Sequence, residues 1–160
     1  MRTWVDASSL IALDTAGALA VLREILERVA ITPEIEAEVF NGRESAELRE
    51  SRGTWIEVRP CRGERKRWED LGLGSGEASL FLTPKGDRLV LDEVPARTVA
   101  EAEGREYVGL LGLLVAAVTS GKLTRDRAKE ILRRLLRSGF RLSADLYDAV
   151  LRDLDRSAGL

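Results

Sequence analysis

The chain has 160 residues, of which 27 are acidic, 25 are basic and 44% are hydrophobic. This length and composition indicate one globular domain with a full core and exclude a disordered chain. There is no histidine and only one cysteine, Cys61, which excludes histidine-based catalysis, an intrachain disulfide and a thiolate metal cluster. A bound metal would therefore have oxygen ligands, which favours Mg²⁺ or Mn²⁺ over Zn²⁺.

The composition also bears on location and partners. The N-terminus shows no signal-peptide pattern, and the longest apolar run, 107–118, is too short and too rich in glycine to span a bilayer. We therefore expect a cytoplasmic protein without a membrane partner. The formal net charge of −2 offers no overall attraction for RNA, so local basic patches or a bound cation would have to supply it.

The first ten residues have the pattern of a strand that leads into a helix. Residues 3–5 are β-branched or aromatic, which predicts a short buried strand. Asp6 follows at once, and Ser8 and Ser9 precede the apolar run 10–13, as helix caps do. We expect Asp6 at the carboxyl edge of an α/β sheet, where ligands bind. By itself the stretch leaves open that Asp6 only caps the helix.

Strands and helices alternate along the rest of the chain. The predicted strands are 3–5, 29–31, 55–58, 88–91 and 107–108. Helices are predicted at 18–27, 33–40 with Thr32 as the cap, 43–52, 75–82, 95–103 and 113–119. Two more follow, one capped by Thr124 and one capped by Ser143 with Leu146, Ala149, Val150 and Leu154 facing inward. This alternation predicts βαβ units and a parallel sheet within one domain.

Four acidic residues fall at related places in this pattern. Asp92 ends a predicted strand as Asp6 does, Glu38 lies at the margin of a buried helical stripe, and Glu77 lies in the first turn of a helix. Glu77 could equally serve the helix dipole alone. In a parallel sheet the four can converge on one crevice, where their repulsion would require a cation. Such an ion can activate water and stabilise phosphoryl charge, so phosphodiester hydrolysis needs no histidine.

A basic stretch, 60–70, is predicted to be a loop. It places Arg62, Arg65 and Arg67 near Trp68. Arginines beside an aromatic ring could contact the backbone and a base of a nucleic acid. The alternative is a solvated surface with no ligand.

Several short motifs occur in a characteristic order. They are Val5-Asp6-Ala7-Ser8-Ser9-Leu10-Ile11, Thr32-Pro33 leading to Glu38-Val39, Gly76-Glu77-Ala78, Leu91-Asp92 with Ala96-Arg97, the Gly-rich turn 109–112, and Gly139-Phe140-Arg141-Leu142-Ser143. Together they resemble the PIN domain, in particular the prokaryotic branch related to VapC-type toxins. The resemblance implies a three-layer α/β/α fold with a central parallel sheet. It also implies a single domain over 1–160, with C-terminal helices at 123–156 packed on it.

The same resemblance implies an activity and its residues. It implies a metal-dependent endoribonuclease, a candidate toxin of a toxin–antitoxin pair, with an antitoxin protein as partner and a homodimeric assembly. Asp6, Glu38, Glu77 and Asp92 would be the catalytic ligands of Mg²⁺ or Mn²⁺, and Glu93 would bind the metal through water. Ser8 would support Asp6. Arginines around the crevice would contact RNA, the candidates being Arg62, Arg65, Arg67 and Arg97.

Two other functions stay open from the residues alone. The first is a catalytically weak or inactive module of the same fold that serves in binding or regulation. The second is a phosphoacceptor domain of the receiver type, because an aspartate at a strand end also suits that chemistry. The chain has no clear signalling lysine at a late strand end, which disfavours the second function.

Overall fold

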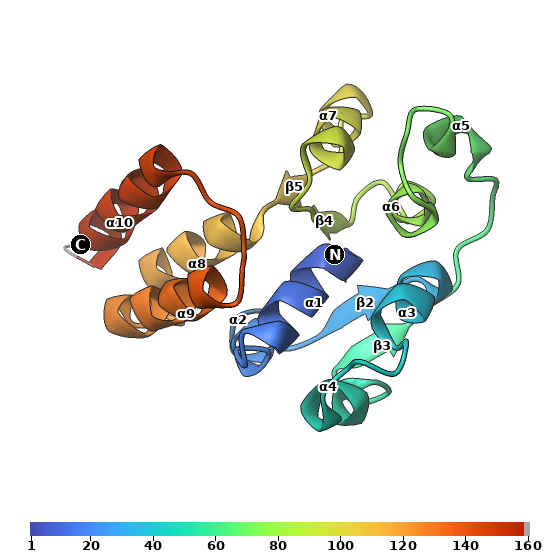
Figure 1. Ribbon diagram of the computed structural model, residues 1–160. Coiled ribbons are helices and arrows are strands. Elements are labelled where there is room, and N and C mark those ends of the chain that lie inside the picture. The colour runs from blue at the N-terminus through green and yellow to red at the C-terminus, as the bar shows by residue number, and fades with distance from the viewer. Residues whose placement is uncertain (159–160) are drawn as a thin grey trace.

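The computed structural model describes the backbone of residues 1–158 (Figure 1). One five-stranded sheet contains β1 Thr3–Val5, β2 Val29–Ile31, β3 Ile56–Val58, β4 Arg88–Val90 and β5 Tyr107–Val108. The described helices are α1 Ala7–Thr15, α2 Ala20–Leu26, α3 Pro33–Val39, α4 Ala46–Ser51, α5 Lys66–Glu69, α6 Ser75–Leu80, α7 Val94–Ala102, α8 Leu110–Thr119, α9 Arg125–Arg137 and α10 Ala144–Ala158. Helices flank the sheet, so the predicted three-layer α/β/α architecture is confirmed.

All strand pairs are parallel, and the strand order is β3-β2-β1-β4-β5. From β1 the chain moves to β2 and β3 on one side, whereas β4 lies on the other side of β1 and continues to β5. The order therefore reverses between β1 and β4. In open parallel sheets, ligands bind at the carboxyl ends of the strands beside such a reversal. Val5 pairs with Val90 across it, which brings the residues that follow the two strands together.

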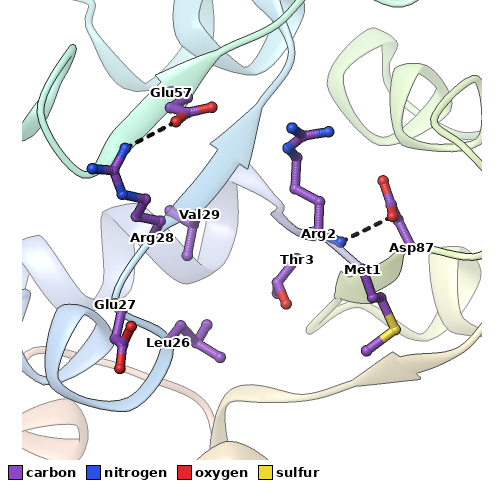
Figure 2. Close-up of a pocket in the computed structure, with 9 residues that line it drawn as sticks. All are labelled: Met1, Arg2, Thr3, Leu26, Glu27, Arg28, Val29, Glu57 and Asp87. Carbon is purple, nitrogen blue, oxygen red and sulfur yellow. Dashed lines mark hydrogen bonds and ion pairs between the residues drawn. The ribbon is translucent and has the colours of Figure 1, made fainter.

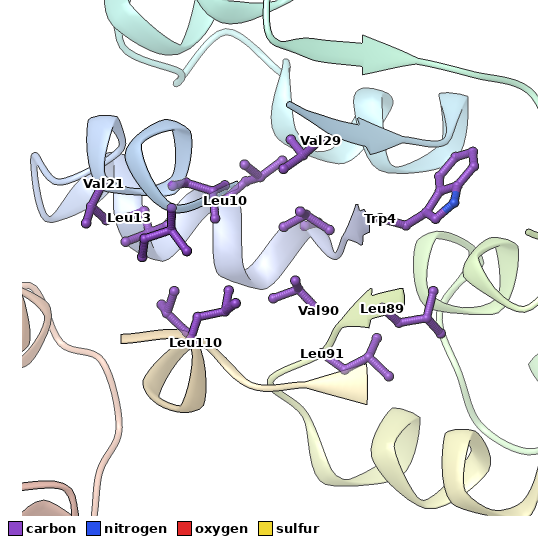
Figure 3. Packing of buried hydrophobic residues seen from close by; sticks show 14 of the residues in the cluster. Trp4, Leu10, Leu13, Val21, Val29, Leu89, Val90, Leu91 and Leu110 are labelled. Atoms are coloured by element: carbon purple, nitrogen blue, oxygen red, sulfur yellow. The ribbon is translucent and has the colours of Figure 1, made fainter. Parts of the chain in front are cut away.

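The core is built from the strands and the first turns that follow them. The β1 residues are all buried, as expected for a parallel strand covered on both faces. Figure 3 shows apolar side chains of β1, α1, β4 and α8 gathered in one cluster, with Leu10, Val90 and Leu110 each at most 1% exposed. Burying each such side chain contributes about 1.5–3 kcal/mol. The rigid core thus sits directly beneath the ends of β1 and β4.

The C-terminal helices form a separate group. Helices α8, α9 and α10 contact one another, and α9 also contacts α1 (Figure 1). Thr124 caps α9 through the N–H of Arg127, and Ser143 accepts the N–H of Leu146 at the start of α10, both as predicted. Within the described residues, no helix is long and apolar enough to cross a membrane.

Two local predictions are wrong, and one alternative that the sequence left open is resolved. Asp6 caps α1, because its side chain accepts the N–H of Ser9, while Ser8 and Ser9 lie within the helix. The stretch 60–70 is not all loop: it contains α5, and Trp68 anchors this short helix by packing on Phe81. Leu146 does not face inward but is 48% exposed, because the buried stripe of α10 begins only at Val150 and continues to Leu154, both of which face inward as predicted.

Candidate active site at the carboxyl edge of the sheet

Asp6 and Asp92 lie side by side at the reversal of strand order. The backbone N–H of Asp92 donates to Asp6 Oδ2 at 3.0 Å, and the N–H of Asp6 donates to the carbonyl of Val90 at 3.1 Å. The register of β1 against β4 produces this arrangement, because each aspartate follows its strand within two residues. Asp6 is 2% exposed and Asp92 is partly buried. The sequence prediction that these two strand ends meet therefore agrees with the structure.

Ser9 and Leu110 hold the two carboxylates in place. The N–H of Ser9 donates to Asp6 Oδ1 at 3.0 Å, while the Ser9 hydroxyl donates to Asp92 Oδ2 at 2.7 Å. The N–H of Leu110, in the first turn of α8, donates to Asp92 Oδ1 at 3.1 Å. Each carboxylate oxygen keeps a second lone pair for a further ligand. The network therefore orients both acids without saturating them.

Arg97 of α7 lies against Asp92. Its Nη2 is 3.6 Å from Asp92 Oδ1, and its Nε donates to the carbonyl of Leu91 at 2.8 Å. A Cβ at position 109 would collide with the Arg97 guanidinium, so Gly109 leaves the space that this side chain fills. A positive charge thus stands beside one of the candidate metal ligands.

Glu38 reaches the start of α6 from the exposed side of α3. Its Oε1 accepts the N–H of Gly76 at 3.2 Å, and a Cβ at Gly76 would lie only 2.5 Å from that oxygen. Below this contact, the hydroxyls of Thr32 and Ser79 lie 2.6 Å apart and join the two helices in the core. The absence of a side chain at Gly76 is therefore what allows Glu38 to approach α6.

Glu77 and Glu93 complete the acidic edge. Glu77 Oε1 accepts the backbone N–H of Gly74, the N-cap residue of α6, at 3.4 Å, whereas Oε2 is buried and has no hydrogen-bond partner among the residues that the structure describes. Glu93 is exposed and accepts the hydroxyl of Ser8 at 3.1 Å. Ser8 thus supports Glu93, while Ser9 takes the role at Asp6 that the resemblance assigned to Ser8.

The acids at this edge influence one another electrostatically. Burial, and to a smaller extent the charge of Asp92, raises the pKa of Asp6 from 3.8 to about 6. The hydrogen bonds from Ser9 and from the backbone of Asp92 lower this pKa, but they do not outweigh burial. Burial also raises the pKa of Glu77, and the charges of Glu93 and Glu38 add to that effect. A cation at this edge would relieve both effects, because it stabilises the ionised carboxylates.

The donor atoms fit a hard divalent cation in type. They are carboxylate oxygens, and within the described residues the buried Oε2 of Glu77 has no hydrogen-bond partner. As the side chains stand, no group of three or more acidic or cysteine residues within the described residues is spaced to hold a metal ion. The structure thus places Asp6 and Asp92 in one hydrogen-bonded network, and Glu38 and Glu77 each at the start of α6, without a complete coordination sphere among the described residues.

The arginines of the basic stretch lie among acidic partners. Arg65 forms ion pairs with Glu34 at 3.2 Å and Glu69 at 3.7 Å, and Arg67 pairs with Glu103 at 2.6 Å. Arg62 is exposed. Trp68 is only 8% exposed, so its ring packs in the core and offers no open face to a base.

A second concave region lies at the opposite edge of the sheet. A pocket of about 450 Å³ opens between the start of β1 and the start of β2 (Figure 2). Two contacts lie in it: Arg28 is 3.3 Å from Glu57, and the backbone N–H of Arg2 donates to Asp87 at 2.9 Å. The amino edge of a parallel sheet is not where such folds bind ligands, which favours the acidic edge as the functional site.

Sequence reasoning overlooked three contributors. Ser9 is the third helical residue after Asp6, so a cap at Asp6 implies that its N–H is a partner, but nothing local indicates that its hydroxyl bonds to Asp92. Gly76 and Gly109 matter through the close approach of Glu38 and Arg97, which no local pattern reveals. The ion pair of Arg97 with Asp92 likewise depends on how α7 lies against the end of β4.

Comparison with known proteins adds one match. The family model DUF3368, described as a PIN domain, matches residues 3–156. No curated protein and no solved structure matched the chain.

Proposed function

The chain belongs to the PIN-domain family, and from this premise we propose that it is an Mg²⁺- or Mn²⁺-dependent endoribonuclease. The observation that carries the proposal is the contact between Asp6 and Asp92 at the reversal of strand order. Glu38 and Glu77 lie at the same edge, where burial and the charges of Glu93 and Glu38 raise the pKa of Glu77. PIN domains are generally nucleases, and a cluster of carboxylates without histidine suits phosphodiester hydrolysis with a divalent cation.

In this proposal Asp6, Glu38, Glu77 and Asp92 hold the cation, and Glu93 assists through water. When bound, the ion supplies an acidified water and stabilises charge on the phosphoryl oxygens. Ser9 and the N–H of Leu110 keep Asp92 oriented, so that no reorganisation is needed when the phosphate arrives. Arg97 stands close enough to the acids to contact a phosphate of the RNA.

The direct test is cleavage of a labelled single-stranded RNA by the full chain. We expect cleavage with Mn²⁺, none with EDTA, and none from Asp6→Asn at the same Mn²⁺ concentration. Cleavage that survives EDTA, or that proceeds at the full rate in Asp6→Asn, would contradict the mechanism.

The finer assignments belong to the same proposal. The motifs that resemble the VapC-related branch suggest a cytoplasmic toxin with an antitoxin partner and a homodimeric assembly. Growth arrest on induced expression, relieved by a gene encoded beside it, would support the toxin role. Sedimentation velocity would test the dimer, and a single species of 17.7 kDa would contradict it.

A second candidate function is a PIN-fold module without catalysis. The contact of Arg97 with Asp92 favours it, because a guanidinium supplies positive charge where a cation would otherwise be needed. Calorimetry with Mn²⁺ separates the two functions. No binding at millimolar Mn²⁺ would favour the module over the nuclease.

A further inference from the structure

A groove begins at the acidic edge and runs along the C-terminal helices. We call it the α8–α10 groove and define it by Arg97, Leu111, Val115, Phe140, Leu142 and Leu146. Its volume is about 620 Å³, within the range of sites that bind small molecules or single residues of a polymer. Asp92 lines its inner end, so the groove is continuous with the candidate active site.

The walls of the groove are mainly apolar. Leu111 and Val115 of α8 face it from one side, and Phe140 and Leu142 from the segment before α10. Leu146 adds apolar surface that is 48% exposed. The ring of Phe140 is only partly buried, so a planar ligand can reach it. An aromatic ring among aliphatic side chains suits a flat apolar surface such as the face of a nucleobase.

The charges at the groove suit a phosphate backbone. Arg97 lies at its inner end and Arg141 beside Phe140. Arg141 is exposed and forms no hydrogen bond or ion pair with the residues that the structure describes, so it is available to a phosphate. The acid at the far end, Asp153, pairs with Arg156. The groove that Asp92 lines therefore also presents two arginines and one aromatic ring to a ligand.

We propose that the α8–α10 groove binds an unstacked base of single-stranded RNA, next to the phosphate held at the acidic edge. The inference rests on the proposed function, which supplies RNA as the ligand. A base in a duplex is stacked on both faces and cannot enter a groove of this kind, so the substrate is single-stranded. Base–aromatic stacking tolerates every base, so the groove selects for strandedness more than for sequence.

The first experiment measures RNA binding apart from cleavage. The full chain in EDTA is titrated against a fluorescent eight-nucleotide unstructured RNA and against the same sequence as a duplex, by fluorescence polarisation. We expect the single strand to bind more tightly than the duplex and Phe140→Ala to weaken it about tenfold. Arg141→Ala should weaken it and reduce the salt dependence. Arg133→Ala, an exposed arginine of α9 outside the groove, is the matched control and should change little.

A second measurement locates the base. An RNA with 5-iodouridine is crosslinked by light to the wild-type chain, and the crosslinked tryptic peptide is identified by mass spectrometry. Attachment within residues 138–141 or 142–152 supports the groove even if Phe140→Ala fails to fold. Attachment elsewhere overturns it, as does equal affinity of the duplex or of both groove variants.

The apolar surface could instead bind a second copy of the chain. In that case Leu146→Asp would convert a dimer into a monomer in sedimentation velocity and leave RNA affinity unchanged, which would overturn the proposal. The cleavage assay with Mn²⁺ is read separately. Binding and crosslinking without cleavage would refute the nuclease alone, whereas cleavage unaffected by the groove variants would refute the groove alone.

Discussion

The backbone N–H of Asp92 donates a hydrogen bond to the carboxylate of Asp6, joining two residues 86 positions apart. The contact follows from the pairing of β1 with β4, and Ser9 reinforces it by bonding to both side chains. Two acids are thereby held together in a largely buried place, where burial and, to a smaller extent, the charge of Asp92 raise the pKa of Asp6.

The raised pKa of Asp6 predicts how stability depends on pH. Burial raises this pKa from 3.8 to about 6 in the folded chain, so between these values the folded state binds a proton that the unfolded state has lost. The free energy of unfolding should therefore fall as pH rises through this window, by about 3 kcal/mol at most from this group. Urea unfolding in EDTA at several pH values measures it. Asp6→Asn should flatten the slope, and an unchanged slope would contradict the assignment.

Removing a candidate ligand should weaken metal binding. In calorimetry with Mn²⁺ at pH 7.5, we expect Asp6→Asn and Asp92→Asn each to lower the affinity about tenfold or more, because each removes a charged oxygen ligand. Asp126→Asn is the matched control, since this acid of α9 has a side chain that is 91% exposed. Equal losses in all three variants would point to nonspecific binding.

The two adjacent serines should differ in their effect on stability. Ser9 is fully buried and its hydroxyl bonds to Asp92 at 2.7 Å, so Ser9→Ala should cost about 1–3 kcal/mol by leaving that oxygen without its donor. Ser8 bonds to the exposed Glu93, and Ser8→Ala should change stability by less than about 0.5 kcal/mol. Thermal and urea unfolding of both variants measure the difference. A larger cost at Ser8 would reverse the roles assigned here.

A side chain at Gly76 should displace Glu38 from its contact with α6. A methyl group there would lie 2.5 Å from Glu38 Oε1, so Gly76→Ala should displace Glu38 from α6 and weaken Mn²⁺ binding. Gly86→Ala is the control, because a Cβ at that position meets nothing within 4 Å. Circular dichroism checks that both variants fold. Wild-type Mn²⁺ affinity in folded Gly76→Ala would show that Glu38 is not a ligand.

Arg97 should lower the affinity of the acidic edge for a cation. Arg97→Ala removes the positive charge 3.6 Å from Asp92 Oδ1, so Mn²⁺ should bind more tightly to the variant in calorimetry. The variant also loses the donor to the carbonyl of Leu91, which should cost about 1–3 kcal/mol in urea unfolding. Weaker Mn²⁺ binding would instead mean that Arg97 chiefly positions Asp92.

Local sequence determined the elements of the fold. β-Branched and apolar residues defined the strands, and the caps at Thr32, Thr124 and Ser143 placed three helix starts correctly, because each depends on residues a few positions apart. Acids after the strands 3–5 and 88–91 were also visible. Since parallel strands end at one edge of a sheet, the strand pattern places these acids at the same edge, whereas their direct contact depends on the pairing of β1 with β4.

Tertiary structure decided how those acids are held and what surrounds them. Which serine supports which acid, the approach of Glu38 to Gly76, and the position of Arg97 beside Asp92 all depend on helices packing against one another across long sequence separations. The burial of Trp68 and the exposure of Leu146 have the same origin. The periodicity of apolar residues along one helix or strand shows that one of its faces has to be buried. Only the segment that packs against that face determines which of its residues are covered.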